Sequence, residues 1–383
     1  MRVTIAGGGT GGHIYPAVGV VEYLRAIDDR IHVAFVGTRS GLEAGIVPSL
    51  GYKIYSIVAK PLPSKKGLMS AVPALASAMV GLVQSFGILL LERPNVVVGT
   101  GGYASGPLVF AASLVGIPTL LIEPNVIPGR TTTLLARMVD RIALGFPESV
   151  RYFRKGTNLR VTGIPVRPRL IAPTREDGLK RFGLDPGRKT VFVFGGSRGA
   201  HSINEAFMAA AAVLQPRSDL QFIIQTGTAD YERVVAAMSK LDVCCRVYPY
   251  IDDIGYAYRA SDLVVSRAGA STLTELAALG LPSILVPYPH ATLSHQEENA
   301  RLLEARGAAV VIMDRDLTGD MLARAIVSII CDRAKHETMS RNSGSLARPE
   351  ASREIAANLI ELAKAKGRLS KLATVLGDIC SAR

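Results

Sequence analysis

The 383-residue sequence has few cysteines and lacks several common catalytic signatures. Its cysteines, Cys244, Cys245, Cys331 and Cys380, form no C-x-x-C pair, so neither a zinc site nor a disulfide framework is indicated, and a reducing cytosolic environment is expected. The chain also lacks the patterns G-x-x-x-x-G-K-[ST] and G-x-S-x-G, which sets aside P-loop and α/β-hydrolase chemistry. None of its six histidines has metal-site spacing, and we expect no cofactor.

One acidic pattern is similar to a metal-binding motif. Asp314-Arg315-Asp316 is a literal D-x-D, which binds a metal together with a nucleotide sugar in some transferases. Because it ends a strand-like run and precedes the helical stretch 318–330, we expect a solvated turn rather than a metal site.

The composition indicates a folded, basic protein. Hydrophobic residues make up 48% and charged residues 20% of the chain, and the net charge is +12. A basic excess suits an anionic partner, such as nucleic acid, a phosphorylated ligand or an acidic lipid surface, although it also simply favours solubility. The first residues, MRVTIAGGG, are expected to form a short buried strand, because their apolar run is too short for a signal peptide.

The stretch Gly67–Leu91 contains no charged residue and is long enough to span a membrane. Strand-like runs precede it (52–58) and follow it (95–98), so the crossover helix of a parallel sheet is expected at this place. A helix this apolar buries most of its surface or presents one face to lipid. Lysines that could meet anionic headgroups lie just upstream, at Lys53, Lys60, Lys65 and Lys66. Peripheral membrane contact, a buried crossover helix and a true span all remain open.

The chain alternates strand-like and helical segments, which is typical of parallel α/β sheets. A strand that runs into a glycine loop occurs at 3–13 (VTIAGGGTGGH) and again at 190–201 (TVFVFGGSRGAH). A strand, glycine turn, helix and Gly-x-Pro stop also recur, at 95–125 and 262–290. The sequence therefore predicts two doubly wound domains that face each other across a cleft lined by glycine loops, with the boundary at 162–169.

The first glycine loop matches G-x-G-x-x-G, the fingerprint of dinucleotide-binding loops. Glycine loops that open helices suit phosphates and sugar hydroxyls in general, because helix N-termini present N–H groups with partial positive charge. A dinucleotide-binding fold would place an acid at the end of its second strand. That strand, 31–37, runs instead into Thr38-Arg39-Ser40. Arg39 suits a 2′-phosphate, so an NADP-dependent oxidoreductase stays as an alternative.

A series of motifs in fixed order extends over nearly the whole chain, to about Leu362. They are Gly7 to His13, Gly99 to Pro107, Glu123 to Gly129, Gly163 to Arg167, Gly195 to Asn204, Tyr250 to Asp253, Ser266 to Pro282 and His295 to Ala300. In this order they resemble the MurG family of N-acetylglucosaminyltransferases, within glycosyltransferase family 28. Three positions depart from the family pattern. Ile122 and Pro124 replace the histidine and the glutamine of the usual His-Glu-Gln-Asn, and Arg198 replaces a glutamine in GGSRGA.

The resemblance implies the GT-B fold. Residues 1–165, with a returning helix at about 349–365, would bind the acceptor and the membrane, and residues 166–348 would bind UDP-GlcNAc. The basic tail 366–383 is expected to be partly disordered.

The implied reaction transfers GlcNAc, with inversion, from UDP-GlcNAc to the 4-hydroxyl of MurNAc in undecaprenyl-diphosphate-linked MurNAc-pentapeptide (lipid I). The product is lipid II for peptidoglycan synthesis, which cell shape and division require. The resemblance further implies peripheral attachment to the cytoplasmic face of the cell membrane through part of Gly67–Leu91, and no nucleic acid partner.

Family residues that contact the sugar and the acceptor carry over to matching positions. Thr10-Gly11-Gly12 and Asn125 are implied to reach the transferred sugar. Gln296 is implied to bind a sugar hydroxyl, with support from Asn299. The loop Gly101-Gly102-Tyr103 is implied to lie on the acceptor side. For Gln296 and Asn299, a solvated helix face is the alternative interpretation.

The nucleotide-binding residues carry over in the same way. Arg167 and Ser197 are implied to contact the diphosphate, and the backbone of Ile251 to read the uracil. The segment Ala270-Ser271-Thr272-Leu273-Thr274-Glu275 would lie under the nucleotide, where Glu275 can accept hydrogen bonds from both ribose hydroxyls. Glu275 could instead only cap its own helical turn.

The chemistry needs a stabilised leaving group and a base. Backbone N–H groups at 266–273 and Arg167 can stabilise the departing diphosphate. His13 is the candidate general base, because it follows the first loop and an imidazole titrates in the working range; alternatively it only packs against the loop. A galactosyltransferase acting on diacylglycerol and a non-catalytic sugar-nucleotide or lipid-binding module remain as further alternatives.

Overall fold

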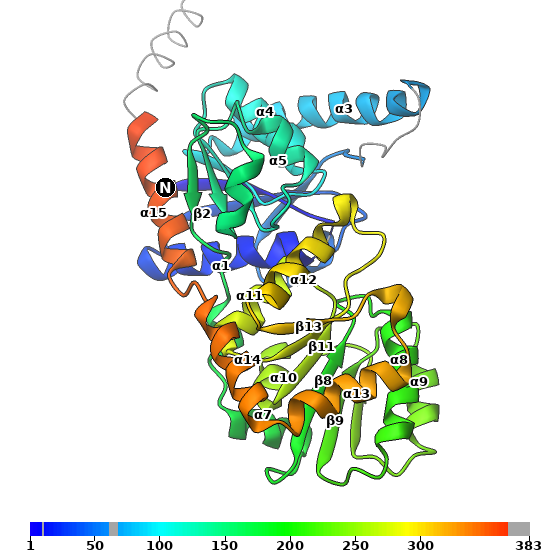
Figure 1. Ribbon diagram of the computed structural model, residues 1–383. Helices are drawn as coiled ribbons and strands as arrows, with labels where there is room; N and C mark the ends of the chain where they lie inside the picture. Colours follow the sequence, from blue (N-terminus) through cyan, green and yellow to red (C-terminus); the bar gives the residue numbers. More distant parts are fainter. Residues whose placement is uncertain (10, 61–67, 367–383) are drawn as a thin grey trace, which may run out of the picture. The chain divides into compact units, whose positions relative to one another are not determined.

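The structure, a computed structural model, describes residues 1–9, 11–60 and 68–366 (Figure 1). It forms two compact units, the first made of Met1–Pro165 with the segment that begins at Glu350, and the second of Val166–Pro349. Beyond Lys366 the predicted basic tail lies outside the described residues.

Unit 1 contains a parallel sheet with the strand order β3-β2-β1-β4-β5-β6-β7. Its strands are β1 (Arg2–Ala6), β2 (His32–Gly37), β3 (Lys53–Ser56), β4 (Val96–Gly99), β5 (Thr119–Glu123), β6 (Arg141–Leu144) and β7 (Leu159–Val161). Its helices are α1 (Gly11–Ile27), α2 (Glu43–Ser49), α3 (Leu68–Glu92), α4 (Ser105–Leu114), α5 (Arg130–Leu135), the 3-10 helix η1 (Pro147–Tyr152) and α15 (Ala351–Lys366).

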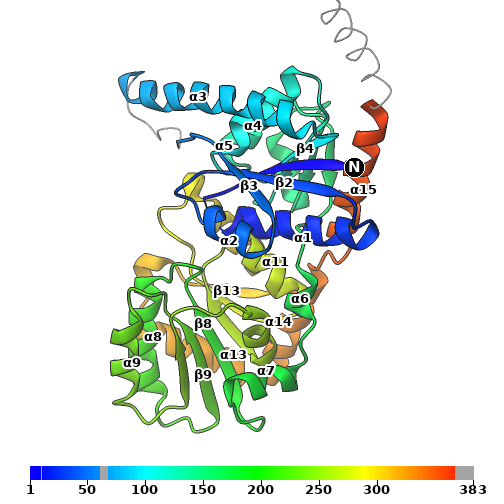
Figure 2. The same ribbon diagram turned by 180° about the vertical axis from the view of Figure 1, so that it is seen from behind.

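The helices of unit 1 cover both faces of its sheet, which explains why the central strands are apolar on both sides. Side chains of α1, α2 and α15 pack on one face and side chains of α3, α4 and α5 on the other. Helix α15 lies against α1, so the end of the described chain completes the core of unit 1 (Figures 1 and 2).

From Leu68 onward the uncharged stretch lies in helix α3, which connects the parallel strands β3 and β4. It packs on α4 and on the sheet through Ile88 and Leu89. In the described part of the chain no helix is long and apolar enough to cross a membrane. The segment is therefore the crossover helix that its position between two strands predicted.

Unit 2 contains a second parallel sheet, with the order β10-β9-β8-β11-β12-β13. Its strands are β8 (Lys189–Phe194), β9 (Leu220–Gln225), β10 (Cys245–Tyr248), β11 (Leu263–Ser266), β12 (Ser283–Leu285) and β13 (Ala309–Val311). Side chains of α8 (His201–Leu214), α9 (Tyr231–Met238), α13 (Gly319–Ile330) and α14 (Arg333–Ser345) pack on one face. Side chains of α6 (Pro168–Ile171), α7 (Arg175–Phe182), α10 (Ile254–Ala260), α11 (Ala270–Leu279) and α12 (His295–Ala305) pack on the other.

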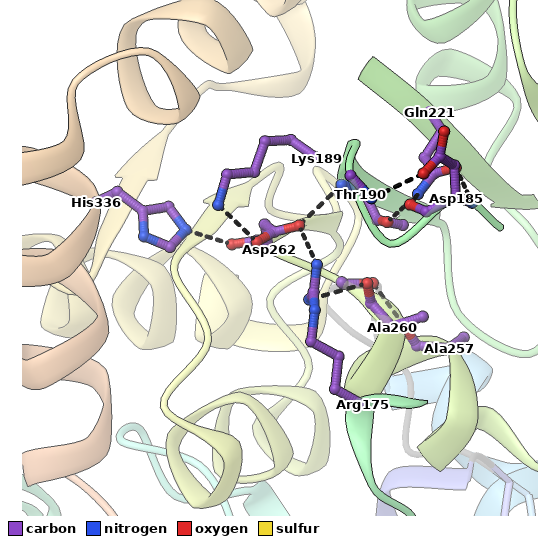
Figure 3. A network of polar contacts seen from close by, with 11 residues as sticks. Arg175, Asp185, Lys189, Thr190, Gln221, Ala257, Ala260, Asp262 and His336 are labelled. Atoms are coloured by element: carbon purple, nitrogen blue, oxygen red, sulfur yellow. Dashed lines mark hydrogen bonds and ion pairs between the residues drawn. The ribbon is translucent and has the colours of Figure 1, made fainter. Parts of the chain in front are cut away.

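A buried carboxylate organises the amino-terminal edge of this second sheet (Figure 3). Asp262 accepts hydrogen bonds from Thr190 N and an Arg175 guanidinium nitrogen, both at 2.9 Å, and from Lys189 Nζ at 3.1 Å. His336 Nε2 donates to the Asp262 carbonyl at 2.8 Å. Burial by itself raises the pKa of Asp262, but these partners outweigh it and lower the pKa below the usual range. The network stabilises the edge opposite the glycine loops.

Candidate functional site

Both sheets reverse their strand order at one point, where ligands bind in doubly wound folds. In unit 1 the reversal lies between β1 and β4, and in unit 2 between β8 and β11. The glycine loops predicted from the sequence follow these four strands at their carboxyl ends. Each unit therefore places two glycine loops side by side at its own reversal point.

The two loops of unit 1 pack directly on each other around His13. His13 Nδ1 lies 3.0 Å from the Gly8 carbonyl oxygen, and Thr100 Oγ1 donates to the His13 carbonyl at 2.7 Å. A Cβ on Gly101 would lie 2.7 Å from His13 Cδ2, and one on Gly102 would lie 2.3 Å from the Gly8 oxygen. Gly101 and Gly102, with φ of 99° and 77°, thus make room for the first loop and its histidine.

The geometry assigns the tautomer of His13. A carbonyl oxygen only accepts hydrogen bonds, so Nδ1 carries the proton and Nε2 the lone pair of the neutral ring. Burial lowers the pKa of His13, and this effect outweighs the Gly8 hydrogen bond and the charge of Glu43, which raise it. An imidazole that is neutral at pH 7 and has a fixed tautomer meets the requirement for a general base.

The other predicted residues of the first loop lie at the start of α1. Gly11 and Gly12 are its first two residues, so their backbone forms the helix N-terminus. Thr10 lies outside the described residues. Tyr103, predicted on the acceptor side, is 48% exposed, and its ring is 4.0 Å from the position a Cβ on Gly9 would take.

Asn125 is held by a neighbouring buried carboxylate. Its backbone N and Nδ2 donate to Glu123 Oε1 at 3.0 and 3.3 Å, while Gly129 N donates to Oε2 at 2.9 Å. Burial raises the pKa of Glu123 in spite of these bonds. Glu123 therefore holds the loop that contains Pro124. Proline has no backbone N–H, so Pro124 itself donates no hydrogen bond to Glu123.

In unit 2, the half-buried Glu275 lies beside two buried residues, Tyr258 and Arg167. The Tyr258 hydroxyl donates to Glu275 Oε2 at 2.9 Å, and the tyrosine ring lies edge-on against Phe192 and Phe194. Burial raises the pKa of Glu275 to about 7, although the Tyr258 bond and the positive charge of Arg167 lower it. Glu275 is thus a carboxyl group that changes its charge near neutral pH.

The remaining nucleotide positions lie on loops and helix starts of unit 2. Ala270, Ser271, Thr272, Leu273 and Thr274 form the first turns of α11, and Ser197 is exposed in the loop after β8. Ile251 N donates to Gln225 Oε1 at 2.9 Å, and Gln225 Nε2 donates to the Gly196 carbonyl at 3.1 Å. Sequence reasoning missed Gln225, which ties the predicted uracil position to the glycine loop.

Gln296 and Asn299 both lie on α12 but make different contacts. Gln296 Oε1 accepts from Tyr288 N at 3.0 Å. Asn299 is fully buried, and its Nδ2 donates to the Ala268 carbonyl at 3.3 Å. Asn299 therefore holds the β11–α11 loop, and the solvated-face interpretation is wrong for it.

The expectation of a solvated turn at Asp314-Arg315-Asp316 is also wrong in one respect. The segment forms the 3-10 helix η3 (Asp314–Asp316), but the Asp314 carboxylate pairs with Arg267 and accepts from Ser202 Oγ at 2.6 Å. Asp314 thus supports the loops after β8 and β11. Among the residues that the structure describes, no cluster of three or more His, Cys, Asp or Glu side chains could hold a metal ion.

Sequence comparison identifies both units. The glycosyltransferase family 28 N-terminal domain model matches residues 3–144, and the C-terminal domain model matches residues 190–358. The chain belongs to glycosyltransferase family 28. This family 28 membership confirms the predicted glycosyltransferase activity and favours it over the NADP-dependent oxidoreductase.

Relatives within family 28 cover the chain almost completely. The chain is 42% identical to a protein of Desulforamulus reducens over 93% of its own length and 97% of that protein, and 43% identical to one of Chlorobaculum parvum over 95% and 100%. Both are named UDP-N-acetylglucosamine--N-acetylmuramyl-(pentapeptide) pyrophosphoryl-undecaprenol N-acetylglucosamine transferase. The predicted resemblance to the MurG family is confirmed.

Solved structures of family 28 and related enzymes share the fold. The crystal structure of Acinetobacter baumannii MurG is 26% identical, with a TM-score of 0.73, over 94% of this chain and 99% of that one. A glycosyltransferase of kitacinnamycin, 17% identical with a TM-score of 0.70 over 94% and 98%, supports the fold alone. The predicted GT-B class, with two parallel-sheet α/β domains, is confirmed.

Proposed function

We propose that this family 28 glycosyltransferase transfers GlcNAc from UDP-GlcNAc to the 4-hydroxyl of MurNAc in lipid I, with inversion at the anomeric carbon. The names of its full-length relatives specify this donor and this acceptor. The observation that carries the proposal is the neutral, oriented imidazole of His13 at the strand reversal of unit 1.

Unit 1 supplies the base in this mechanism. As the acceptor oxygen bonds to the anomeric carbon of GlcNAc, its proton passes to His13 Nε2, and the bond between that carbon and the UDP oxygen breaks. Attack opposite the leaving group inverts the configuration. Gly101 allows the imidazole to occupy this position, because a side chain there would clash with the ring.

Unit 2 holds the nucleotide and stabilises the departing diphosphate. The N-terminal turn of α11 directs backbone N–H groups and a partial positive charge toward its start, where an anion binds well. Arg167 adds a full charge next to Glu275, whose carboxylate would accept from the ribose hydroxyls. Donor recognition thus needs no metal ion in this proposal.

Helix α3 would bind the membrane surface. Its outward face carries Met79, Val80, Val83, Leu90 and Leu91, of which Val83 is 69% and Leu90 76% exposed. Exposed apolar side chains of this kind on one helix suit the interfacial region of a bilayer. Of the upstream lysines, Lys60 is exposed, Lys53 pairs with Glu92, and Lys65 and Lys66 lie outside the described residues. These features support peripheral attachment to the cytoplasmic face of the membrane, where lipid I would be reached, as part of the proposal.

The test is release of UDP from UDP-GlcNAc in the presence of a lipid I analogue. We expect release only with that acceptor, and a loss of roughly 10²- to 10⁴-fold in His13→Ala, because a general base contributes about this factor. No release by the folded wild-type protein would reject the proposal. Preference for UDP-galactose would favour the diacylglycerol galactosyltransferase, and near-normal turnover of His13→Ala would move the base elsewhere.

A further inference from the structure

A single peptide group connects His13 with a buried carboxylate. The Gly8 carbonyl accepts a hydrogen bond from His13 Nδ1–H at 3.0 Å. The N–H of the same peptide group, which belongs to Gly9, donates a hydrogen bond to Glu43 Oε2 at 2.8 Å. In a trans peptide the C=O and N–H point in opposite directions, so the imidazole and the carboxylate lie on opposite sides of it. Two hydrogen bonds therefore link His13 to Glu43 through the Gly8–Gly9 peptide group.

Glu43 is built into this place. Its side chain is 1% exposed, and its second oxygen, Oε1, accepts from Thr38 N at 2.8 Å and Thr38 Oγ1 at 2.9 Å. Glycines surround the carboxyl group closely. A Cβ at Gly8, Gly37 or Gly41 would come within 2.2, 2.3 or 2.1 Å of a Glu43 side-chain atom. A glycine is thus needed at position 8 to leave room for the Glu43 carboxylate, whether or not the loop also binds a ligand.

We infer that Glu43 is a positioning residue for the transfer reaction, acting on His13 through the Gly8–Gly9 peptide group. It would do for His13 what a directly bonded aspartate does in a catalytic triad, namely fix the tautomer and stabilise the imidazolium that forms. The inference rests on the proposed function, because it needs His13 as the base.

The Glu43 carboxylate influences the His13 imidazole in two ways. Hydrogen bonds in a chain polarise one another, so a carboxylate on the Gly9 N–H makes the Gly8 carbonyl a stronger acceptor for Nδ1–H. The negative charge of Glu43 also favours the protonated imidazole directly. Two other titratable side chains lie near the first loop, Tyr15 on α1 and Tyr103 after β4. Both carry hydroxyl groups, whereas Glu43 carries a carboxylate.

The test compares pH–rate profiles of the full-length enzyme with UDP-GlcNAc and a water-soluble lipid I analogue. Glu43→Gln keeps the shape but removes the charge and offers Gly9 N–H a competing donor. We expect kcat to fall about 10- to 100-fold, less than on losing the base itself, with the KM for UDP-GlcNAc unchanged. The acidic limb of the profile should move to lower pH, because His13 loses a neighbouring negative charge.

Glu43→Asp provides the rescue variant, since it keeps the charge while shortening the side chain. We expect its acidic limb to stay at the wild-type pH. Glu92→Gln is the matched control. Glu92 is a buried carboxylate of the same unit that accepts from His32 Nε2 at 2.8 Å and Lys53 Nζ at 3.0 Å, at the end of α3. Its substitution should lower the melting temperature and leave the limb in place.

The outcomes separate this inference from the proposed function. An inactive wild-type enzyme would reject the function. An active wild-type enzyme in which Glu43→Gln loses rate without any movement of the acidic limb, or loses nothing, would overturn the role of Glu43. If Glu43→Gln does not fold, a Glu43→Asp limb displaced from the wild-type position would overturn it as well.

Discussion

Glu275 shows at the scale of one residue how a binding role conflicts with stability. Its carboxyl group is held among Tyr258, Arg167 and the aromatic core, where burial raises its pKa to about 7. A carboxylate in this place can accept from two ribose hydroxyls, but its charge is costly in the absence of a ligand. The residue is therefore suited to binding rather than to folding.

We predict that UDP-GlcNAc binding strengthens as the pH rises through about 7, because only the ionised Glu275 accepts from both hydroxyls. Glu275→Gln should raise the Kd at pH 8 by about 10- to 100-fold, in line with the ~1.5–3 kcal/mol of a charged hydrogen bond, and flatten the pH dependence. Calorimetric titration at several pH values measures both effects. An unchanged pH dependence in the variant would place the titrating group elsewhere.

The same substitution should stabilise the unliganded protein. The folded pKa of Glu275 lies above its unfolded value of 4.5, so its penalty on folding grows as the pH rises from 4.5 to about 7 and stays constant above that. Glu275→Gln should accordingly raise the melting temperature at pH 8 and have little effect at pH 4.5. A lower melting temperature at pH 8 would contradict the assignment.

Helix α3 combines two roles at the scale of one element. As the crossover between β3 and β4 it must pack on the sheet, and Ile88 and Leu89 do so. Its opposite face is apolar and exposed, and packing within the fold does not require apolar residues at Val83 and Leu90. An apolar face without a packing role is the sign of an external contact.

We predict that the double substitution Val83→Asp and Leu90→Asp weakens binding to vesicles containing anionic lipid by about tenfold or more, because two apolar side chains that would enter the interface become charged. Co-sedimentation at fixed salt measures the partitioning. Val213→Asp is the matched control, since Val213 is 52% exposed on α8 of unit 2. Equal loss in control and variant would show that added negative charge alone reduces binding.

At the scale of the whole molecule, the chain builds unit 1 from both of its ends. Helix α15 packs Ile355, Ala356 and Leu359 into the core beside α1, and Arg141 on β6 binds Glu361 and Asn358. Unit 2 is built from one continuous segment. The integrity of unit 1 therefore depends on residues that follow unit 2 in the sequence.

We predict that Leu359→Ala destabilises unit 1 by about 2–5 kcal/mol, because it opens a cavity in a fully buried position. UDP-GlcNAc binding, proposed for unit 2, should persist at temperatures below the altered transition. Scanning calorimetry with and without the nucleotide separates the two. Leu114→Ala, at an exposed position of unit 1, should change stability by no more than about 0.5 kcal/mol. Loss of nucleotide binding together with α15 packing would show that the units unfold as one.

The sequence by itself determined the two parallel sheets, the glycine loops at their strand reversals and the family. These features are recorded in local patterns, since apolar runs, glycine turns and helix stops read the same in any context. It also singled out His13 and Glu275, because each directly follows or lies within a motif.

Only the tertiary structure decided which side chains act on these residues. Glu43, Gln225 and Asp314 stand outside the motif positions singled out as sites, and each finds its partner through a strand order that places distant loops side by side. The residues directly after β2, Thr38-Arg39-Ser40, include no acid, whereas Glu43 at the start of α2 accepts a hydrogen bond from Gly9 N in the first loop. Burial, charge and hydrogen bonding are set by such neighbours, and the order of residues along the chain does not contain them.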